Sequence, residues 1–163
     1  MRVLVACEFS GVVRDAFTAR GHDAWSCDLL PSERPGQHIQ AEHDLHLFDI
    51  ITGGAWDLLI AHPPCTFLCN SGVLRLYIGK EKNLERWELM RRAADFFKAL
   101  LNAPVPRVAV ENPVMHGHAV RLIGQRHSQS IQPFHFGHPE RARSSSDGQA
   151  SVRFFGIVIG TCS

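Results

Sequence analysis

The chain has 163 residues, of which 45% are hydrophobic and 20% are charged, and its formal net charge is +1. This composition is typical of a soluble globular domain and excludes a disordered chain, a collagen and a coiled coil. The length predicts one domain with a hydrophobic core, and no apolar run reaches the ~18 residues that a membrane span needs.

Charge, cysteine content and the first residues narrow the class of protein further. The small net charge argues against a protein that coats DNA without specificity, because such proteins carry a large basic excess. Five cysteines fit reduced thiols better than a disulfide framework. The sequence enters a strand-like run directly after Met1, without the regions of a signal peptide, so we expect a cytoplasmic location.

Short apolar runs predict strands, and apolar residues at helical spacing predict helices. In chain order we expect a strand over Arg2–Cys7, a helix from Val12 that stops at Gly21, a strand over Ala24–Asp28, a loop over Leu30–Gln40, a strand over Trp56–Ala61, a long helix over Asn83–Asn102, a strand over Arg107–Val110, a short helix over His118–Ile123, a strand over Ser130–Phe136, a polar loop over Arg141–Ala150 and a strand over Val152–Ile159. This alternation predicts an α/β fold with a mostly parallel sheet.

Polar clusters follow four of the predicted strands. They are Cys7–Gly11, Cys27-Asp28, His62–Cys65 and Glu111–Pro113. Ligands of parallel α/β sheets bind beyond the carboxyl ends of the strands, where these clusters would gather. Each cluster alone has a structural explanation, such as a turn or a strand end, but together they favour a ligand site.

The first two clusters are suited to an adenosine-type ligand. Gly11 lets a ligand approach the backbone, and the carboxylate of Asp28 can accept hydrogen bonds from ribose hydroxyls. The complete G-x-G-x-x-G pattern is not present, so the glycine alone is a weak signal.

The other two clusters are suited to nucleophilic chemistry. Cys65 follows two prolines that would hold its thiol rigidly, and Glu111 can give a proton to the group under attack. An alternative is a metal site of Cys65, Cys69, His116 and His118. Their C-x3-C and H-x-H spacings are not those of common zinc sites, so we expect no metal.

These motifs resemble those of the cytosine-C5 DNA methyltransferases. The family's nucleophile motif is Pro-Pro-Cys-Gln-x-Phe-Ser-x-x-Gly, and Pro63–Gly72 (PPCTFLCNSG) matches its Pro, Pro, Cys and Gly. Glu111-Asn112-Pro113 is similar to the family's Glu-Asn-Val, and Cys7–Gly11 to its Asp-Leu-Phe-x-Gly. The likeness is closer to small, often phage-encoded members without a target-recognition domain. It covers residues 1–140, the implied catalytic domain, whereas residues 141–163 diverge as a Ser/Arg-rich linker and apolar end of the same domain.

The resemblance implies a Rossmann-like class I methyltransferase fold with S-adenosylmethionine as the methyl donor. The implied donor-binding residues are Phe9, Ser10, Gly11, Asp28, Asp44 and Pro63. Among them, Phe9 would pack on the adenine, Asp28 would hold the ribose and Asp44 would contact the adenine amine.

The resemblance also implies roles toward a cytosine. Cys65 would attack C6, and Glu111 would hold and protonate N3. Pro64, Asn112 and Arg126 would bind the substrate. Arg126 is assigned by position only, because the family's Gln-x-Arg-x-Arg motif has no clean counterpart here. A target within a DNA duplex would have to be flipped out.

The expected activity is therefore methyl transfer to C5 of cytosine, in DNA or alternatively in a free cytidine nucleotide. A further alternative is a non-catalytic methylase-like fold that binds nucleic acid or a protein. Basic side chains after the nucleophile motif are candidates for phosphate contacts or simply a solvated face, namely Arg75, Lys80, Lys82, Arg86, Arg91 and Arg92. The sequence leaves open whether the protein is a monomer or a homodimer.

Overall fold

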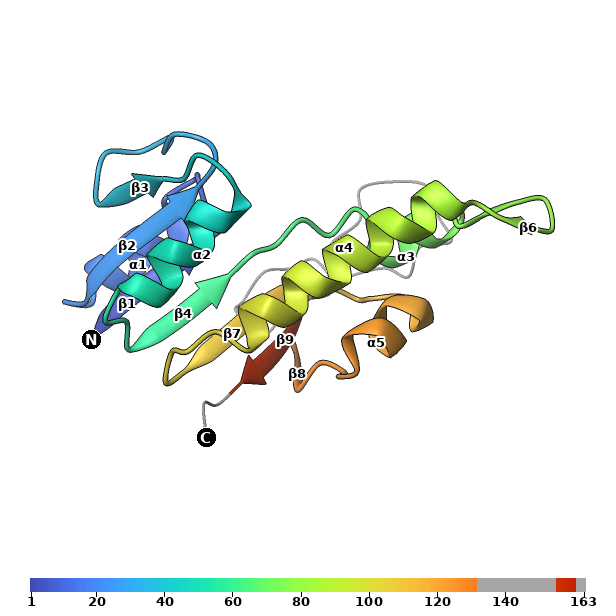
Figure 1. Cartoon of the computed structure of the whole chain (residues 1–163). Helices are drawn as coiled ribbons and strands as arrows, with labels where there is room; N and C mark the ends of the chain where they lie inside the picture. The colour runs from blue at the N-terminus through green and yellow to red at the C-terminus, as the bar shows by residue number, and fades with distance from the viewer. Residues whose placement is uncertain (132–154, 161–163) are drawn as a thin grey trace, which may run out of the picture. The chain divides into compact units, whose positions relative to one another are not determined.

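The computed structural model describes residues 1–131 and the backbone of residues 155–160 (Figure 1). The chain divides into two compact units. Among the described residues, unit 1 comprises residues 1–64, 96–110 and 159–160, and unit 2 comprises residues 65–95, 111–131 and 155–158.

Unit 1 is built on a parallel sheet. Its strands are β1 (Arg2–Ala6), β2 (Asp23–Asp28), β3 (His38–Gln40), β4 (Leu58–Ala61) and the first half of β7 (Val108–Pro113). They lie in the order β3-β2-β1-β4-β7, and each neighbouring pair is parallel. Beyond β7 the strand order continues with β9 (Phe155–Gly160) and then β8 (Gln129–Ile131), which pair antiparallel. The predicted α/β fold with a mostly parallel sheet is confirmed.

The central strand β1 explains why this sheet forms. Its residues from Val3 to Ala6 are fully buried, as expected for a parallel strand covered on both faces. The helix α1 (Val12–Thr18) packs Val13 and Phe17 against the apolar cluster of β1 and β2. Parallel strands must be joined by crossovers, and α1 provides the one between β1 and β2.

Two expectations in the first half of the chain are wrong. The last three residues of the predicted loop Leu30–Gln40 form β3, because they pair with β2 from Ser26 to Asp28. The helix α2 (Asp44–Gly53) has no predicted counterpart. It buries Leu47 and Ile51, four residues apart on one face, and His43 caps its N-terminus by accepting a hydrogen bond from the backbone of His46.

Unit 2 contains the segments on either side of a long helix. They are α3 (Asn70–Val73), the hairpin β5 (Tyr77–Ile78) and β6 (Glu81–Lys82), the first part of α4 (Leu84–Leu101), the second half of β7, α5 (Gly117–Ile123), β8 and the first four residues of β9. The predicted long helix is confirmed within two residues. No described helix is both long and apolar enough to cross a membrane.

The strand β7 is longer than the predicted Arg107–Val110, since it continues to Pro113. A proline lacks only its own N–H and is tolerated at a strand end. Glu111 and Asn112 are therefore strand residues, and their side chains point to opposite faces. The predicted strands at Ser130–Phe136 and Val152–Ile159 are represented by β8 and β9. Residues 132–136, 141–150 and 152–154 of the predicted elements lie outside the described residues.

Candidate active site

Three polar side chains of unit 1, those of Cys7, Asp28 and Asp44, lie near the carboxyl ends of β1 and β2. Cys7 follows β1 with a φ of 57°, the only positive φ among the described residues other than glycine. Burial raises the pKa of its thiol well above the usual range, and the neighbouring Cys27 thiol and the carboxylates of Asp28 and Asp44 raise it further. The Cys7 thiol is therefore neutral and a poor nucleophile. The effect of Asp28 and Asp44 on its pKa means that both carboxylates lie near the end of β1.

Glu8 caps the N-terminus of α1, a role that was not predicted from the sequence. Its carboxylate is 5% exposed and accepts hydrogen bonds from the backbone N–H of Val13 at 2.6 Å and of Arg14 at 3.3 Å. The Ser10 hydroxyl donates to the same carboxylate at 3.2 Å. A negative charge at the N-terminus of α1 is favourable because the first N–H groups of a helix have no partner within the helix. The motif CEFSG thus builds the turn from β1 into α1.

Gly11 occupies the N-cap of α1 in the left-handed conformation, with φ 70°. A side chain there would be strained, and its Cβ would lie 2.5 Å from the Arg14 guanidinium. The expected turn at Gly11 is confirmed by this geometry. The glycine makes room for a protein side chain, whereas the sequence suggested room for a ligand.

Arg14 holds the segment between β2 and β3. Its side chain is buried, and its guanidinium donates to the hydroxyls of Ser26 and Ser32 at 3.3 and 3.2 Å and to the carbonyl of Pro35 at 3.0 Å. Gly36, with φ 141°, allows this approach, since a Cβ there would lie 2.8 Å from Arg14 Cζ. No sequence pattern singled out Arg14. The hydrogen bonds of the buried Arg14 side chain fix the position of the segment that follows Asp28.

A cavity of about 220 Å³ opens beside these groups in unit 1. It is lined by Cys7, Glu8, Phe9, Ser10, Val13 and His62. Two expected donor-binding residues, Phe9 and Ser10, therefore line one cavity, and the Phe9 ring is 38% exposed. Asp28 accepts a hydrogen bond from the backbone of Leu30 at 2.9 Å through Oδ1. The exposed ring and the nearby carboxylates are groups that could hold an adenosine with a cationic substituent.

In unit 2, Cys65–Cys69, here called the Cys65 loop, is a tight turn. The backbone N–H groups of Leu68 and Cys69 both donate to the Cys65 carbonyl at 3.0 Å. Arg86 from α4 donates to the Thr66 carbonyl at 3.2 Å, and its guanidinium lies 4.3 Å from the centre of the Phe67 ring. Arg86 is thus engaged in holding the Cys65 loop.

The Cys65 loop is joined to the segment that follows Glu111. Cys69 forms a β-bridge with Met115, and the backbone N–H of His116 donates to the Leu68 carbonyl at 3.0 Å. His116 Nε2 donates to the Phe67 carbonyl at 3.2 Å. These contacts bring together two motifs that are more than forty residues apart in sequence, and both belong to unit 2.

The His116 side chain is nearly buried, and both of its nitrogens are occupied. Nδ1 accepts from the backbone N–H of Ala119 at 3.1 Å, which caps α5, while Nε2 serves the Cys65 loop. Burial lowers the pKa of His116, so the neutral ring with Nε2–H is favoured. The sequence offered His116 only as a metal-ligand alternative. Among the described residues, no group of three or more His, Cys, Asp or Glu side chains could hold a metal ion.

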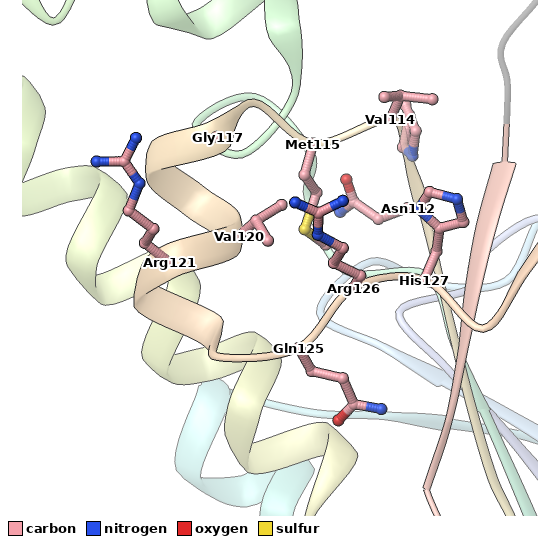
Figure 2. A pocket seen from close by; sticks show the side chains of 10 residues that line it. Asn112, Val114, Met115, Gly117, Val120, Arg121, Gln125, Arg126 and His127 are labelled. Carbon is pink, nitrogen blue, oxygen red and sulfur yellow. The ribbon is translucent and has the colours of Figure 1, made fainter.

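A second cavity, of about 330 Å³, lies between the end of β7 and α5 (Figure 2). It is lined by Asn112, Pro113, Val114, Met115, Gly117, Val120, Arg121, Gln125, Arg126 and His127. Two expected substrate-binding residues, Asn112 and Arg126, share this cavity. Neither Cys65 nor Glu111 is among these lining residues, and the alternation along β7 directs Glu111 to the other face of the strand.

Several of the basic side chains after the nucleophile motif already have protein partners. Arg91 and Arg92 each pair with Glu88 at 3.4 Å, and Lys82 lies over the ring of Trp87 at 5.1 Å. Pro63 is buried at the end of β4, and Pro64 is exposed. Pro63, which was expected to bind the donor, and Pro64, which was expected to bind the substrate, are not among the lining residues of the two cavities described above.

Comparison with known proteins bears on the fold. No protein-family model matches the sequence, and no curated protein matches it. One solved structure that does match is described as a candidate DNA modification methyltransferase encoded within a prophage of E. coli. The alignment has a TM-score of 0.52 and 17% sequence identity, and it covers 99% of this chain and 46% of that one. This chain therefore spans under half the length of that structure, and the likeness shows the α/β, Rossmann-like fold of a methyltransferase.

Proposed function

We propose that this protein transfers a methyl group from S-adenosylmethionine to C5 of cytosine, with Cys65 as the nucleophile and Glu111 as the acid. The observation that carries the proposal is the joining of the two motifs in unit 2 through the Cys69–Met115 bridge and His116. A loop that must present a thiol to a base needs such support, because small misplacements of reacting groups cost large factors in rate.

The chemistry follows from the two side chains. Cys65 Sγ forms a bond to C6 of the base while Glu111 gives a proton to N3, so that electron density collects at C5. C5 then takes the methyl group. Loss of the C5 proton to solvent, return of the N3 proton to Glu111 and cleavage of the S–C6 bond release the product and the thiolate.

S-adenosylmethionine, when bound, supplies the methyl group as an electrophile. We assign its adenosine to the end of β1 and β2, with Phe9 against the adenine and with Asp28 and Asp44 as hydrogen-bond acceptors. Two carboxylates near the neutral Cys7 thiol make this region acidic, which suits a ligand with a positive charge. Ser10, Gly11 and Pro63 would shape the same donor site. The neighbour described as a DNA methyltransferase supports DNA as the substrate.

The test is a methyl-transfer assay with labelled S-adenosylmethionine and two substrates, cytosine-containing DNA and dCMP. Nucleoside mass spectrometry would identify the product. We expect 5-methylcytosine with the native chain and none with Cys65→Ala. Glu111→Gln should lower the rate by a factor of about 10²–10⁴, as expected for loss of a proton donor.

Glu85→Gln is the matched control, because it removes an exposed carboxylate from the first turn of α4. It should keep the native rate. Product that persists in Cys65→Ala, or methylation at any atom other than C5, would contradict the proposed mechanism. The substrate pool that carries the label separates a DNA enzyme from one that acts on a free nucleotide.

A further inference from the structure

We propose that the cavity between β7 and α5 binds a nucleotide that is not the one that reacts, with its base edge on Asn112 and its phosphate on Arg126. The inference rests on the proposed function for the class of substrate. The cavity itself is defined by the structure (Figure 2).

The first observation is an unpartnered buried amide. Asn112 is 1% exposed, and neither its Nδ2 nor its Oδ1 has a hydrogen-bond partner among the described residues. Buried side-chain polar groups in folded proteins nearly always have partners, so such a group calls for a ligand or a reason for strain. Asn112 lines the cavity, so its unpaired amide belongs to the wall against which a bound ligand would lie.

The second observation is the chemistry around that amide. Val114, Met115 and Val120 provide apolar surface, and in Figure 2 the Arg126 side chain extends toward Met115 and Asn112. An amide presents a donor beside an acceptor, which matches the edge of a nucleobase. A guanidinium is suited to a phosphate, which it can bind through two parallel hydrogen bonds.

The third observation separates this cavity from the reacting base. Glu111 and Asn112 are consecutive residues of β7, so their side chains leave opposite faces of the strand. A base held by Glu111 and Cys65 therefore cannot also use the Asn112 amide. The cavity is a subsite for a second nucleotide, and it gives this small chain a means of reading sequence next to its target.

The experiment measures binding to the full-length chain without any methyl donor. The probes are a fluorescent single-stranded pentanucleotide containing cytosine, the same strand with abasic sites, and dCMP as competitor. We expect Asn112→Leu and Arg126→Ala each to weaken binding of the pentanucleotide by about tenfold. Asn112→Leu should leave binding of the abasic strand unchanged, since that strand offers no base edge.

Arg121→Ala is the matched control for Arg126→Ala. Both variants remove one exposed arginine from the cavity lining, but in Figure 2 the Arg121 guanidinium points away from Asn112. Arg121→Ala should change the affinity by less than about twofold. Competition by dCMP at concentrations similar to the pentanucleotide would identify a free nucleotide as the ligand. Its failure to compete would identify a nucleic-acid strand.

Thermal unfolding provides an independent readout. Asn112→Leu should raise Tm by a few degrees, because it removes an unpaired buried amide and the cavity has room for the larger side chain. A lower Tm together with unchanged affinity would show that Asn112 is structural, and it would overturn the inference.

The inference and the proposed function can fail separately. Cys65→Ala should keep nucleotide binding while it abolishes methyl transfer. If the native chain methylates cytosine but Asn112→Leu and Arg126→Ala bind as tightly as the native chain, the inference is wrong and the proposed function stands. If these variants bind weakly but no methyl transfer occurs, the subsite stands and the proposed reaction is wrong.

Discussion

His116 Nε2 donates a hydrogen bond to the carbonyl oxygen of Phe67 at 3.2 Å, across 49 positions of sequence. The other ring nitrogen accepts from the backbone of Ala119 and caps α5. One neutral imidazole thus connects the Cys65 loop to the helix that follows Glu111. The position of the proposed nucleophile therefore depends on a residue that takes no part in the reaction.

Removing this imidazole should weaken both the fold and the reaction. In His116→Ala, α5 loses its cap and the Phe67 carbonyl loses its donor, so the free energy of unfolding should fall by about 1–3 kcal/mol in urea titrations. Methyl transfer should fall even at temperatures where the variant stays folded. His118→Ala serves as the control, because it keeps both hydrogen bonds of His116 and removes only ring contacts, with Trp87 and with His116 itself. Equal effects of the two variants would argue against the positioning role.

The same residue predicts a pH dependence of stability. Burial lowers the pKa of His116 in the folded state below the usual 6.5, so the unfolded chain binds the proton more readily. Stability should therefore rise with pH between the lowered folded pKa and 6.5, and be fully present above 6.5. It should fall as the pH drops through that window. In His116→Asn, which keeps a capping side chain but cannot titrate, urea midpoints should lose this component of the pH dependence.

Arg14→Met should destabilise unit 1. The change removes the guanidinium from the buried contact with the Ser26 hydroxyl and from the part-buried contacts with Ser32 and the Pro35 carbonyl. We expect a loss of about 2–4 kcal/mol in the free energy of unfolding. It should also weaken binding of S-adenosylmethionine in calorimetry, since the released segment begins at the proposed ribose-binding Asp28. Arg20→Ala is the matched control, with one exposed hydrogen bond to Ala16 and an expected loss of about 0.5 kcal/mol or less. A native-like Arg14→Met would contradict the role given to this side chain.

Gly72→Ala should impair methyl transfer by moving the Cys65 loop. A Cβ on Gly72 would lie 2.6 Å from the carbonyl oxygen of Thr66, which is backbone and cannot turn aside. Alanine otherwise favours a helix by up to about 1 kcal/mol, so a loss would report this contact. We expect initial rates to fall by a factor of about 10–100.

Gly53→Ala is the control for this substitution, because a Cβ on Gly53 meets no atom within 4 Å. The control should be neutral in rate and in thermal unfolding. An unchanged rate in Gly72→Ala would mean that the loop shifts without affecting the thiol.

Local hydrophobic patterns in the sequence predicted much of the fold. The Val-rich run of β1 and the apolar stripe of α4 are strong signals, and their predicted positions are confirmed within two residues. The helix α2 was missed because its apolar residues are spread around the helix, and one of them, Leu45, is exposed. The strand β3 was missed because it has three residues, and its pairing with β2 supplies what its own sequence lacks.

The motifs at the strand ends could be predicted from the sequence, because Cys65, Glu111 and Asp28 are reactive or polar residues that directly follow apolar runs. The side chains that hold these motifs in place could not be predicted. The burial of Arg14 and His116 was not predicted, since a single sequence does not reveal which polar side chains are buried by segments distant along the chain. The tertiary structure alone decided that Arg14 holds the turn after β2, that His116 holds the Cys65 loop, and that Asn112 faces a cavity away from Glu111. The first two depend on contacts between segments that are distant in sequence. The third depends on β7 continuing beyond its predicted end, so that Glu111 and Asn112 alternate as strand residues. Local periodicity shows neither feature.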